Sequence, residues 1–190
     1  MLKKFYITTT TPYVNGDPHI GFAKEIIFAD VIARYHRLIG EEVRFNTGTD
    51  EHGQKIFEKA QELGKDPQTY IDELAPRFEA LKKPLNLSFT DFSRTSSPQH
   101  KRAAQELWKR CDANGYIYKA KQKIMYCVGC ELEKTDSELM NGKCPIHPNR
   151  ELEVREEDNY FFKFSALQEK LTKFYNDTPN FVVPDFRFEE

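Results

Sequence analysis

The segment at residues 10–22 constrains the fold of this chain more than any other, because it joins a β-rich run to a long apolar one. The run before it, at residues 4–9, is rich in aromatic and β-branched residues, as strands are. The run after it, at residues 20–39, has apolar residues at helical spacing. Between them we expect Asp17 to be the helix N-cap and Pro18 to take the first helical position, where its missing N–H costs nothing. The segment is therefore predicted to be a tight turn between a strand and a helix that starts with His-x-Gly.

The first turn of this helix has chemistry suited to an anion. His19 falls where backbone N–H groups and the helix dipole attract negative charge. Gly21 has no side chain and lets a ligand come close to the backbone. The carboxylate of Asp17 opposes an anion here unless its capping bonds occupy it. From these residues alone, a nucleotide-phosphate site and an ordinary capped helix with an incidental histidine both stay open.

A second strand is predicted at residues 42–47, after Gly40 ends the helix, and it leads into Gly48. Strand, helix and strand in succession predict a βαβ unit of a parallel sheet, whose ligands bind at the carboxyl ends of the strands. Residues 12–22 and 48–53 both lie at such ends, so we expect ligand chemistry there. The helix is apolar over a wide sector and should be covered on more than one side, with one face formed by Ile20, Ala23, Ile27, Val31 and Leu38.

The bounds of the other predicted helices and strands are set by Gly, Pro and capping residues. We expect a third strand at residues 89–94, and helices at residues 53–63, 67–83 and 98–114. The texture then changes to short strands, expected at residues 116–119, 123–126, 150–155 and 159–164. The last two strands are expected to flank an acidic turn at residues 156–158, before a short helix at residues 165–175.

Three of the four cysteines lie near a histidine in the second half of the chain. Cys127 and Cys130 form a Cys-x-x-Cys pair, and Cys144 and His147 form a Cys-x-x-His pair. Two such pairs can close a tetrahedral zinc site, and four protein ligands with no open position predict a structural role. A redox Cys-x-x-Cys pair and unrelated free thiols are the alternatives, although neither explains the histidine.

The composition is that of a water-soluble chain with a packed core. Of 190 residues, 39% are hydrophobic and 31% charged, and the net charge of −2 announces no basic field for nucleic acid. No run approaches the roughly 18 apolar residues of a membrane span, and the first residues have no apolar signal-peptide core. We therefore expect a cytoplasmic protein without a membrane partner.

Two segments of the chain resemble a known family. His-Ile-Gly at residues 19–21 resembles the start of the His-Ile-Gly-His signature of class I aminoacyl-tRNA synthetases. Asn-Thr-Gly-Thr-Asp-Glu-His-Gly-Gln-Lys-Ile at residues 46–56 looks like the second landmark of the methionyl-tRNA synthetases in particular. The resemblance covers essentially the whole chain, including the Cys/His pattern. Phe22 stands where the signature has its second histidine, and a phenyl ring cannot donate that histidine's hydrogen bond to ATP.

The resemblance implies roles for four residues. In the ATP site, His19 would stabilise the α-phosphate in the transition state and Gly21 would admit the adenine ring. In the methionine site, Asp50 would hold the ammonium group and Tyr13 would close over the side chain, where a sulfur–aromatic contact is favourable. The alternatives are that Tyr13 is a core residue after a strand and that Asp50 caps a helix.

The resemblance also implies an architecture and an activity. The α/β fold would comprise the first half of a class I Rossmann-type parallel sheet at residues 1–115 and a connective insertion with a zinc knuckle at residues 116–190. The activity would be that of a methionine–tRNA ligase. ATP, with Mg²⁺, would activate L-methionine to methionyl-adenylate, and the methionyl group would pass to the methionine tRNA. The second class I signature, of the Lys-Met-Ser-Lys-Ser type, does not occur in these residues. We therefore expect a fragment of a larger enzyme that is inactive by itself.

Three other functions are compatible with part of the pattern. A class I synthetase for leucine, valine, isoleucine or cysteine would share the His-x-Gly element, and so would a different nucleotidyl transferase of the same superfold. A non-catalytic zinc-binding module would bind metal but neither ATP nor methionine. The landmark at residues 46–56 and the spacing of the Cys/His pairs argue against a sibling synthetase, and the nucleotidyl transferase would share only the first motif and needs no zinc knuckle. Calorimetry with methionine would separate the zinc-binding module.

Overall fold

The computed structural model describes residues 2–130 and 132–188. It divides into two compact units, Met1–Glu106 and Leu107–Glu190. The division falls inside helix α4 (Pro98–Ala113), upstream of the predicted boundary at residue 115. Each unit has its own sheet, and the two sheets differ in type.

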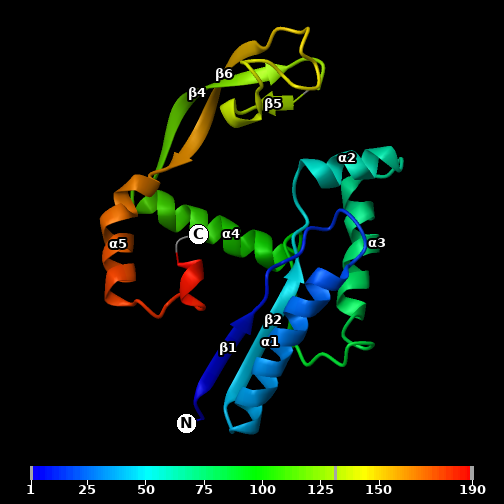
Figure 1. Ribbon diagram of the computed structural model, residues 1–190, viewed down its shortest axis with the longest axis vertical. Coiled ribbons are helices and arrows are strands. Elements are labelled where there is room, and N and C mark those ends of the chain that lie inside the picture. The colour runs from blue at the N-terminus through cyan, green and yellow to red at the C-terminus, as the bar shows by residue number, and fades with distance from the viewer. Residues whose placement is uncertain (1, 131, 189–190) are drawn as a thin grey trace. The chain divides into compact units, whose positions relative to one another are not determined.

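The first unit is built on a parallel sheet, as predicted. Its strands are β1 (Lys4–Thr8), β2 (Glu42–Thr49) and β3 (Asp91–Arg94), in the order β1-β2-β3. β2 runs parallel to both neighbours, so the carboxyl ends of all three strands meet at one edge of the sheet. Figure 1 shows β1 and β2 running in the same direction beside helix α1 (Ile20–Leu38). The βαβ unit expected from the sequence is therefore confirmed.

The core of this unit lies between the sheet and the helices α1, α2 (Gln54–Glu62) and α3 (Pro67–Ala80). Helix α1 buries a face different from the predicted one, made of Phe22, Ile26, Ala29 and Ala33. Two alanines on this face allow the helix to approach the sheet closely. In the described part of the chain the predicted face is largely uncovered, since Ile20, Ile27, Val31 and Leu38 are exposed. The expectation that α1 is covered on more than one side is therefore wrong for these residues.

The second unit holds an antiparallel sheet with the strand order β5-β4-β6. Its strands are β4 (Ile117–Cys127), β5 (Leu132–Lys134) and β6 (Glu153–Phe162). They are followed by helix α5 (Gln168–Asp177), and the short 3₁₀ helices of the chain are Asp136–Glu138, Phe164–Leu167 and Asp185–Arg187. No helix in residues 2–130 and 132–188 is long and apolar enough to cross a membrane.

The four short strands predicted for this unit are in fact two long ones. β4 runs through residues 117–127 without a break, and β6 includes the acidic segment that was expected to form a turn. Glu156 lies directly opposite Lys123 in the ladder and within 4.0 Å of the ammonium groups of Lys121 and Lys123. Opposite charges across neighbouring strands are compatible with a continuous ladder, so the charge run does not end the strand.

Candidate active site and metal centre

The two segments singled out in the sequence meet at the carboxyl ends of β1 and β2. The backbone N–H of Asp50 donates to the carbonyl of Pro12 at 2.9 Å, and the N–H of Val14 donates to the carbonyl of Asp50 at 3.1 Å. Tyr13 and Asp50 are thereby paired as a parallel bridge just beyond the two strands. The structure thus brings together the two residues that the resemblance assigns to methionine.

Tyr13 packs on Gly53, at the start of α2. A Cβ atom added to Gly53 would lie 1.8 Å from the hydroxyl oxygen of Tyr13, and the φ angle of +129° already favours glycine. Tyr13 is half-buried and contacts the core cluster without being fully enclosed by it. Gly53 therefore leaves the space that the hydroxyl end of Tyr13 occupies. The two residues are far apart in the sequence, so the sequence does not predict this contact.

Asp50 is not a helix cap. Helix α2 begins at Gln54 with Gly53 as its N-cap residue, and no side chain caps it. Asp50 is half-buried, and within the described ranges its carboxylate has no hydrogen-bond or ion-pair partner. A carboxylate held in place by its own backbone bonds is suited to receive an ammonium group.

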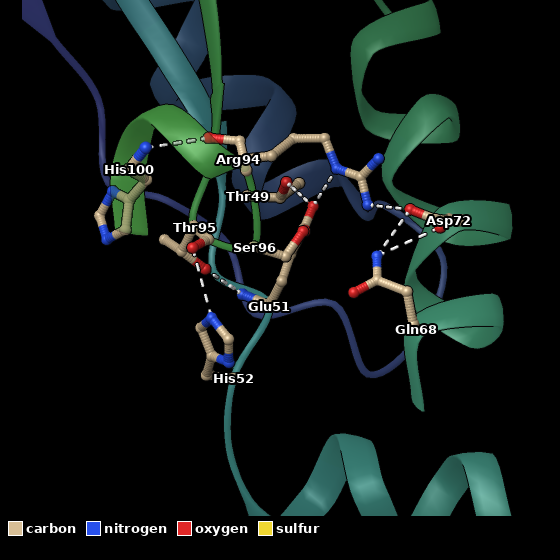
Figure 2. A network of polar contacts seen from close by, with 10 residues as sticks. Thr49, Glu51, His52, Gln68, Asp72, Arg94, Thr95, Ser96 and His100 are labelled. Carbon is tan, nitrogen blue, oxygen red and sulfur yellow. Dashed lines mark hydrogen bonds and ion pairs between the residues drawn. The ribbon is translucent and has the colours of Figure 1, made fainter. Parts of the chain in front are cut away.

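Directly after Asp50, the side chain of Glu51 is fully buried and belongs to a polar network (Figure 2). One carboxylate oxygen accepts from Arg94 Nε at 2.7 Å and from Thr49 Oγ1 at 2.6 Å, and the other accepts from the Ser96 hydroxyl. Burial raises the pKa of Glu51, but the donors Arg94, Ser96 and Thr49 outweigh it and hold the pKa below its usual value. Sequence reasoning missed this network, because Arg94 and Ser96 reach Glu51 only through the pairing of β3 with β2.

His19 is the N-cap of α1, which begins at Ile20. Its Nδ1 accepts from the backbone N–H of Gly21 at 3.1 Å, and the side chain is exposed. The expectation that Asp17 caps the helix with Pro18 in its first turn is wrong. Asp17 instead pairs with Arg77 of α3 at 2.6 Å. No acidic residue lies in the first turn of α1, so the repulsion expected between Asp17 and an anion loses its basis.

The Gly21 position and the Phe22 position differ in what they offer to a ligand. Gly21 is exposed, and a Cβ atom there would lie 3.0 Å from the His19 ring, so the absence of a side chain lets that ring fold over the helix start. Phe22 is buried and meets Phe78 edge-on, with the ring centroids 5.8 Å apart. Phe22 therefore packs in the core, whereas His19 and Gly21 of the signature lie at the surface.

In the second unit, the four predicted metal ligands form one cluster. The ligand atoms of Cys127, Cys130, Cys144 and His147 all lie within 4.8 Å of one another. His147 Nδ1 is 3.1 Å from Cys130 Sγ and 3.8 Å from Cys127 Sγ, and the sulfurs of Cys130 and Cys144 are 3.4 Å apart. Tetrahedral zinc, with bonds of about 2.0–2.3 Å, separates its ligand atoms by about 3.4–3.8 Å. The donor set and its spacing thus fit a zinc ion.

The acid–base chemistry of Cys130 and Cys144 also suits a cation. Burial and the neighbouring sulfurs of Cys144 and Cys127 raise the pKa of Cys130 to about 11. Burial acts in the same direction on Cys144, but the backbone N–H of His147 and other donors lower the pKa of that thiol to about 6. The Cys144 thiolate therefore forms readily, while the Cys130 thiol resists a second negative charge beside it. A divalent cation removes that conflict.

Gly129 allows His147 to reach the cluster. A Cβ atom at Gly129 would lie 2.6 Å from two atoms of the imidazole ring, closer than packed atoms can approach. The Cys-x-x-Cys loop therefore needs glycine at this place for the histidine to lie against it. The spacing of the cysteines predicted the ligands, but only the structure shows this requirement.

Comparison with known proteins agrees with this geometry. The sequence pattern of the family described as "tRNA synthetases class I (M)" matches residues 5–151. Methionine–tRNA ligases of Thermosynechococcus vestitus and Nostoc sp. are 49% and 46% identical over 100% and 99% of this chain. Mycobacterium tuberculosis methionyl-tRNA synthetase, solved in complex with methionyl-adenylate, superposes with a TM-score of 0.82 at 36% identity over 98% of this chain. The chain spans about a third of these relatives, 36% of each ligase and 37% of the solved chain.

A parallel sheet that feeds a His-x-Gly helix start, with the family match over most of the chain, defines a class I aminoacyl-tRNA synthetase. The meeting of Tyr13 with Asp50 lies in the part of the chain that this match covers. Within the class, the chain belongs to the methionyl-tRNA synthetase family.

Proposed function

We propose that the full-length protein containing this chain is a methionine–tRNA ligase. The methionine carboxylate would attack the α-phosphate of ATP, giving methionyl-adenylate and pyrophosphate, and the methionyl group would then pass to the methionine tRNA. The observation that carries the proposal is the pairing of Tyr13 with Asp50 at the strand ends, in a chain of this family. The solved relative was crystallised with methionyl-adenylate, the product of the first step.

The proposed roles follow the geometry of the side chains. His19 donates to the phosphate as negative charge develops on it, and Gly21 leaves room for the nucleotide at the helix start. Asp50 pairs with the methionine ammonium and Tyr13 covers the thioether. Mg²⁺ would accompany ATP and neutralise the phosphates, and the residues described here supply positioning for this step. Residues 1–115 act in this proposal as the first half of the nucleotide-binding domain, and residues 116–190 as a connective insertion.

Exchange of pyrophosphate into ATP tests the reaction directly. We expect the full-length protein to catalyse this exchange with methionine, and to prefer it at least about tenfold in kcat/KM over leucine, valine, isoleucine and cysteine. A preference for one of those four amino acids would assign the chain to a sibling enzyme. Methionine binding without any exchange would exclude the ligase, and the absence of both would favour a non-catalytic metal-binding module.

For the second unit we infer a structural zinc ion held by Cys127, Cys130, Cys144 and His147. The support is the cluster of four ligand atoms within 4.8 Å of one another. Four protein ligands complete a tetrahedral zinc site and leave no position for a substrate. Bound zinc would tie the loop after β4 to the segment that precedes β6, and would hold three sulfurs as thiolates.

The requirement for glycine beside His147 gives a sharp test of the zinc site. We expect Gly129→Ala to lower the zinc content of the purified full-length protein from about one ion per chain to less than half, because the added methyl group displaces the imidazole. Cys144→Ser should act in the same direction. Val128→Ala, at the exposed neighbouring position, is the matched control and should keep its zinc. Full zinc content in both Gly129→Ala and Cys144→Ser, measured by elemental analysis, would contradict this ligand set.

A further inference from the structure

Glu51 is a buried acid next to the proposed ammonium ligand, and the reaction proposed above does not use it. The Glu51 side chain is fully buried, and its carboxylate accepts hydrogen bonds from Arg94, Thr49 and Ser96. The Glu51 backbone N–H also donates to Thr95 Oγ1 at 2.8 Å. Four contacts therefore fix this one residue, and three of them come from residues at or just after the end of β3.

Arg94 extends the network to a third element. Its Nε atom donates to Glu51, and its Nη2 atom donates to Asp72 of α3 at 2.6 Å. Asp72 in turn accepts from Gln68 Nε2 at 3.1 Å. Figure 2 shows the Arg94 guanidinium between the two carboxylates, one on the β2 side and one on α3. The end of β2, the end of β3 and helix α3 are thus joined by directional bonds.

The buried Glu51–Arg94 ion pair is not explained by stability alone. Removing two charges from water costs about as much as their attraction returns, and apolar residues of similar volume often stabilise as well. What the pair provides is geometry, because a guanidinium and a carboxylate bind each other in a fixed orientation.

The neighbouring group that this network can hold in place is the Asp50 carboxylate. It is covalently adjacent to Glu51, and its own backbone is bonded to Pro12 and Val14 on either side of Tyr13. A shift of Glu51 would therefore move the Asp50 carboxylate and the Tyr13 segment together. His19 is held differently, by its contact with the Gly21 N–H on α1, and does not depend on this network.

We propose that Glu51 and Arg94 are positioning residues for methionine: their buried pair sets the place of the Asp50 carboxylate without touching a substrate. This inference rests on the proposed function, since it needs Asp50 to hold the ammonium group. In this proposal the end of β3, through Arg94, contributes to amino-acid binding although it contacts no substrate.

The test is Glu51→Gln in the full-length protein, which keeps the shape of the side chain and removes its charge. We expect the KM for methionine in pyrophosphate exchange to rise roughly 10- to 100-fold, as misplacement of a binding group does, with the KM for ATP within about twofold of the wild type. The matched control is Asp91→Asn. It breaks the exposed Arg44–Asp91 pair (2.8 Å), which joins the same two strands away from Asp50, and should leave both KM values unchanged.

A purely structural role for Glu51 would give another result. The melting temperature and the fraction of active enzyme would fall while both KM values stayed the same, and that outcome would overturn the inference. If Glu51→Gln does not fold, Ser96→Ala decides, because it removes one donor to the same carboxylate. We expect Ser96→Ala to raise the methionine KM alone by roughly 2- to 10-fold, and an unchanged value would overturn the inference as well.

The failure of this inference can be told from that of the proposed function. If Asp50→Ala lowers the affinity for methionine and Glu51→Gln does not, the positioning role is wrong and the ligase assignment stands. If the wild-type protein shows no methionine-dependent exchange, the proposed function and this inference fall together.

Discussion

Replacing His19 by alanine in the full-length protein should lower the rate of methionine-dependent ATP–pyrophosphate exchange by roughly 10²- to 10³-fold. The Nδ1 atom of His19 accepts a hydrogen bond from the Gly21 N–H, so the neutral ring has its proton on Nε2. In the proposed reaction, that N–H donates to an oxygen of the α-phosphate as charge develops there. The measurement is the exchange rate at saturating methionine and ATP, with the two KM values determined alongside it.

A second variant separates the two things that His19 does. Serine is a good N-cap residue but its hydroxyl is too short to replace the imidazole Nε2. His19→Ser should therefore match the wild type in melting temperature and be as slow in exchange as His19→Ala. A rate within about threefold of the wild type in His19→Ser would show that His19 only caps the helix, and the role in phosphate transfer would be wrong.

The parts that could be predicted from the sequence depend on local patterns. The β1-α1-β2 unit follows from a β-rich run, a helical period and a second short run, and none of these signals needs a distant partner. The Cys/His cluster follows from two x₂-spaced pairs, because that spacing allows both ligands of each pair to face the same point. The meeting of residues 12–22 with residues 48–53 follows from parallel topology, which gathers the carboxyl ends of neighbouring strands.

The parts that could not be predicted depend on contacts between distant residues. Asp17 and Pro18 form the stronger local start signal for α1, but Arg77 of α3 binds Asp17 and His19 caps the helix instead. Glu156 interrupts no strand because lysines from β4 face it across the ladder. These partners lie far away in the sequence, so no window around Asp17 or Glu156 contains the information.

The same limit explains why the network around Glu51 was missed. Its donors Arg94 and Ser96 lie beyond two intervening helices, and they reach Glu51 only because β3 pairs with β2. A charged residue in a strand-end motif is normally read as a ligand contact or a surface group. The structure adds a third possibility, a buried and fully hydrogen-bonded acid, which in our proposal holds its neighbour Asp50 in place.

The second large effect is expected at Asp50. Asp50→Ala in the full-length protein should lower the affinity for methionine by roughly 30- to 1000-fold, or about 2–4 kcal/mol, because a charge-assisted hydrogen bond to the ammonium group is lost. ATP binding should change by less than about threefold, since His19 and Gly21 lie at the start of α1 and, in the described part of the chain, share no hydrogen bond with the Asp50 carboxylate. Calorimetric titration with each ligand measures both affinities in the same preparation.

The charge on Asp50, rather than its size, carries this expectation. Asp50→Asn keeps the side-chain volume and the backbone bonds to Pro12 and Val14 but removes the charge. Its affinity for methionine should therefore fall nearly as far as that of Asp50→Ala. Asp17→Asn removes an acid from the neighbouring loop, where the carboxylate pairs with Arg77 at the surface, and should leave methionine affinity within about twofold. Methionine affinity retained in Asp50→Asn would mean that the ammonium group binds elsewhere. In that case the half-buried Asp50 carboxylate would have to be explained by its place beside Tyr13 alone.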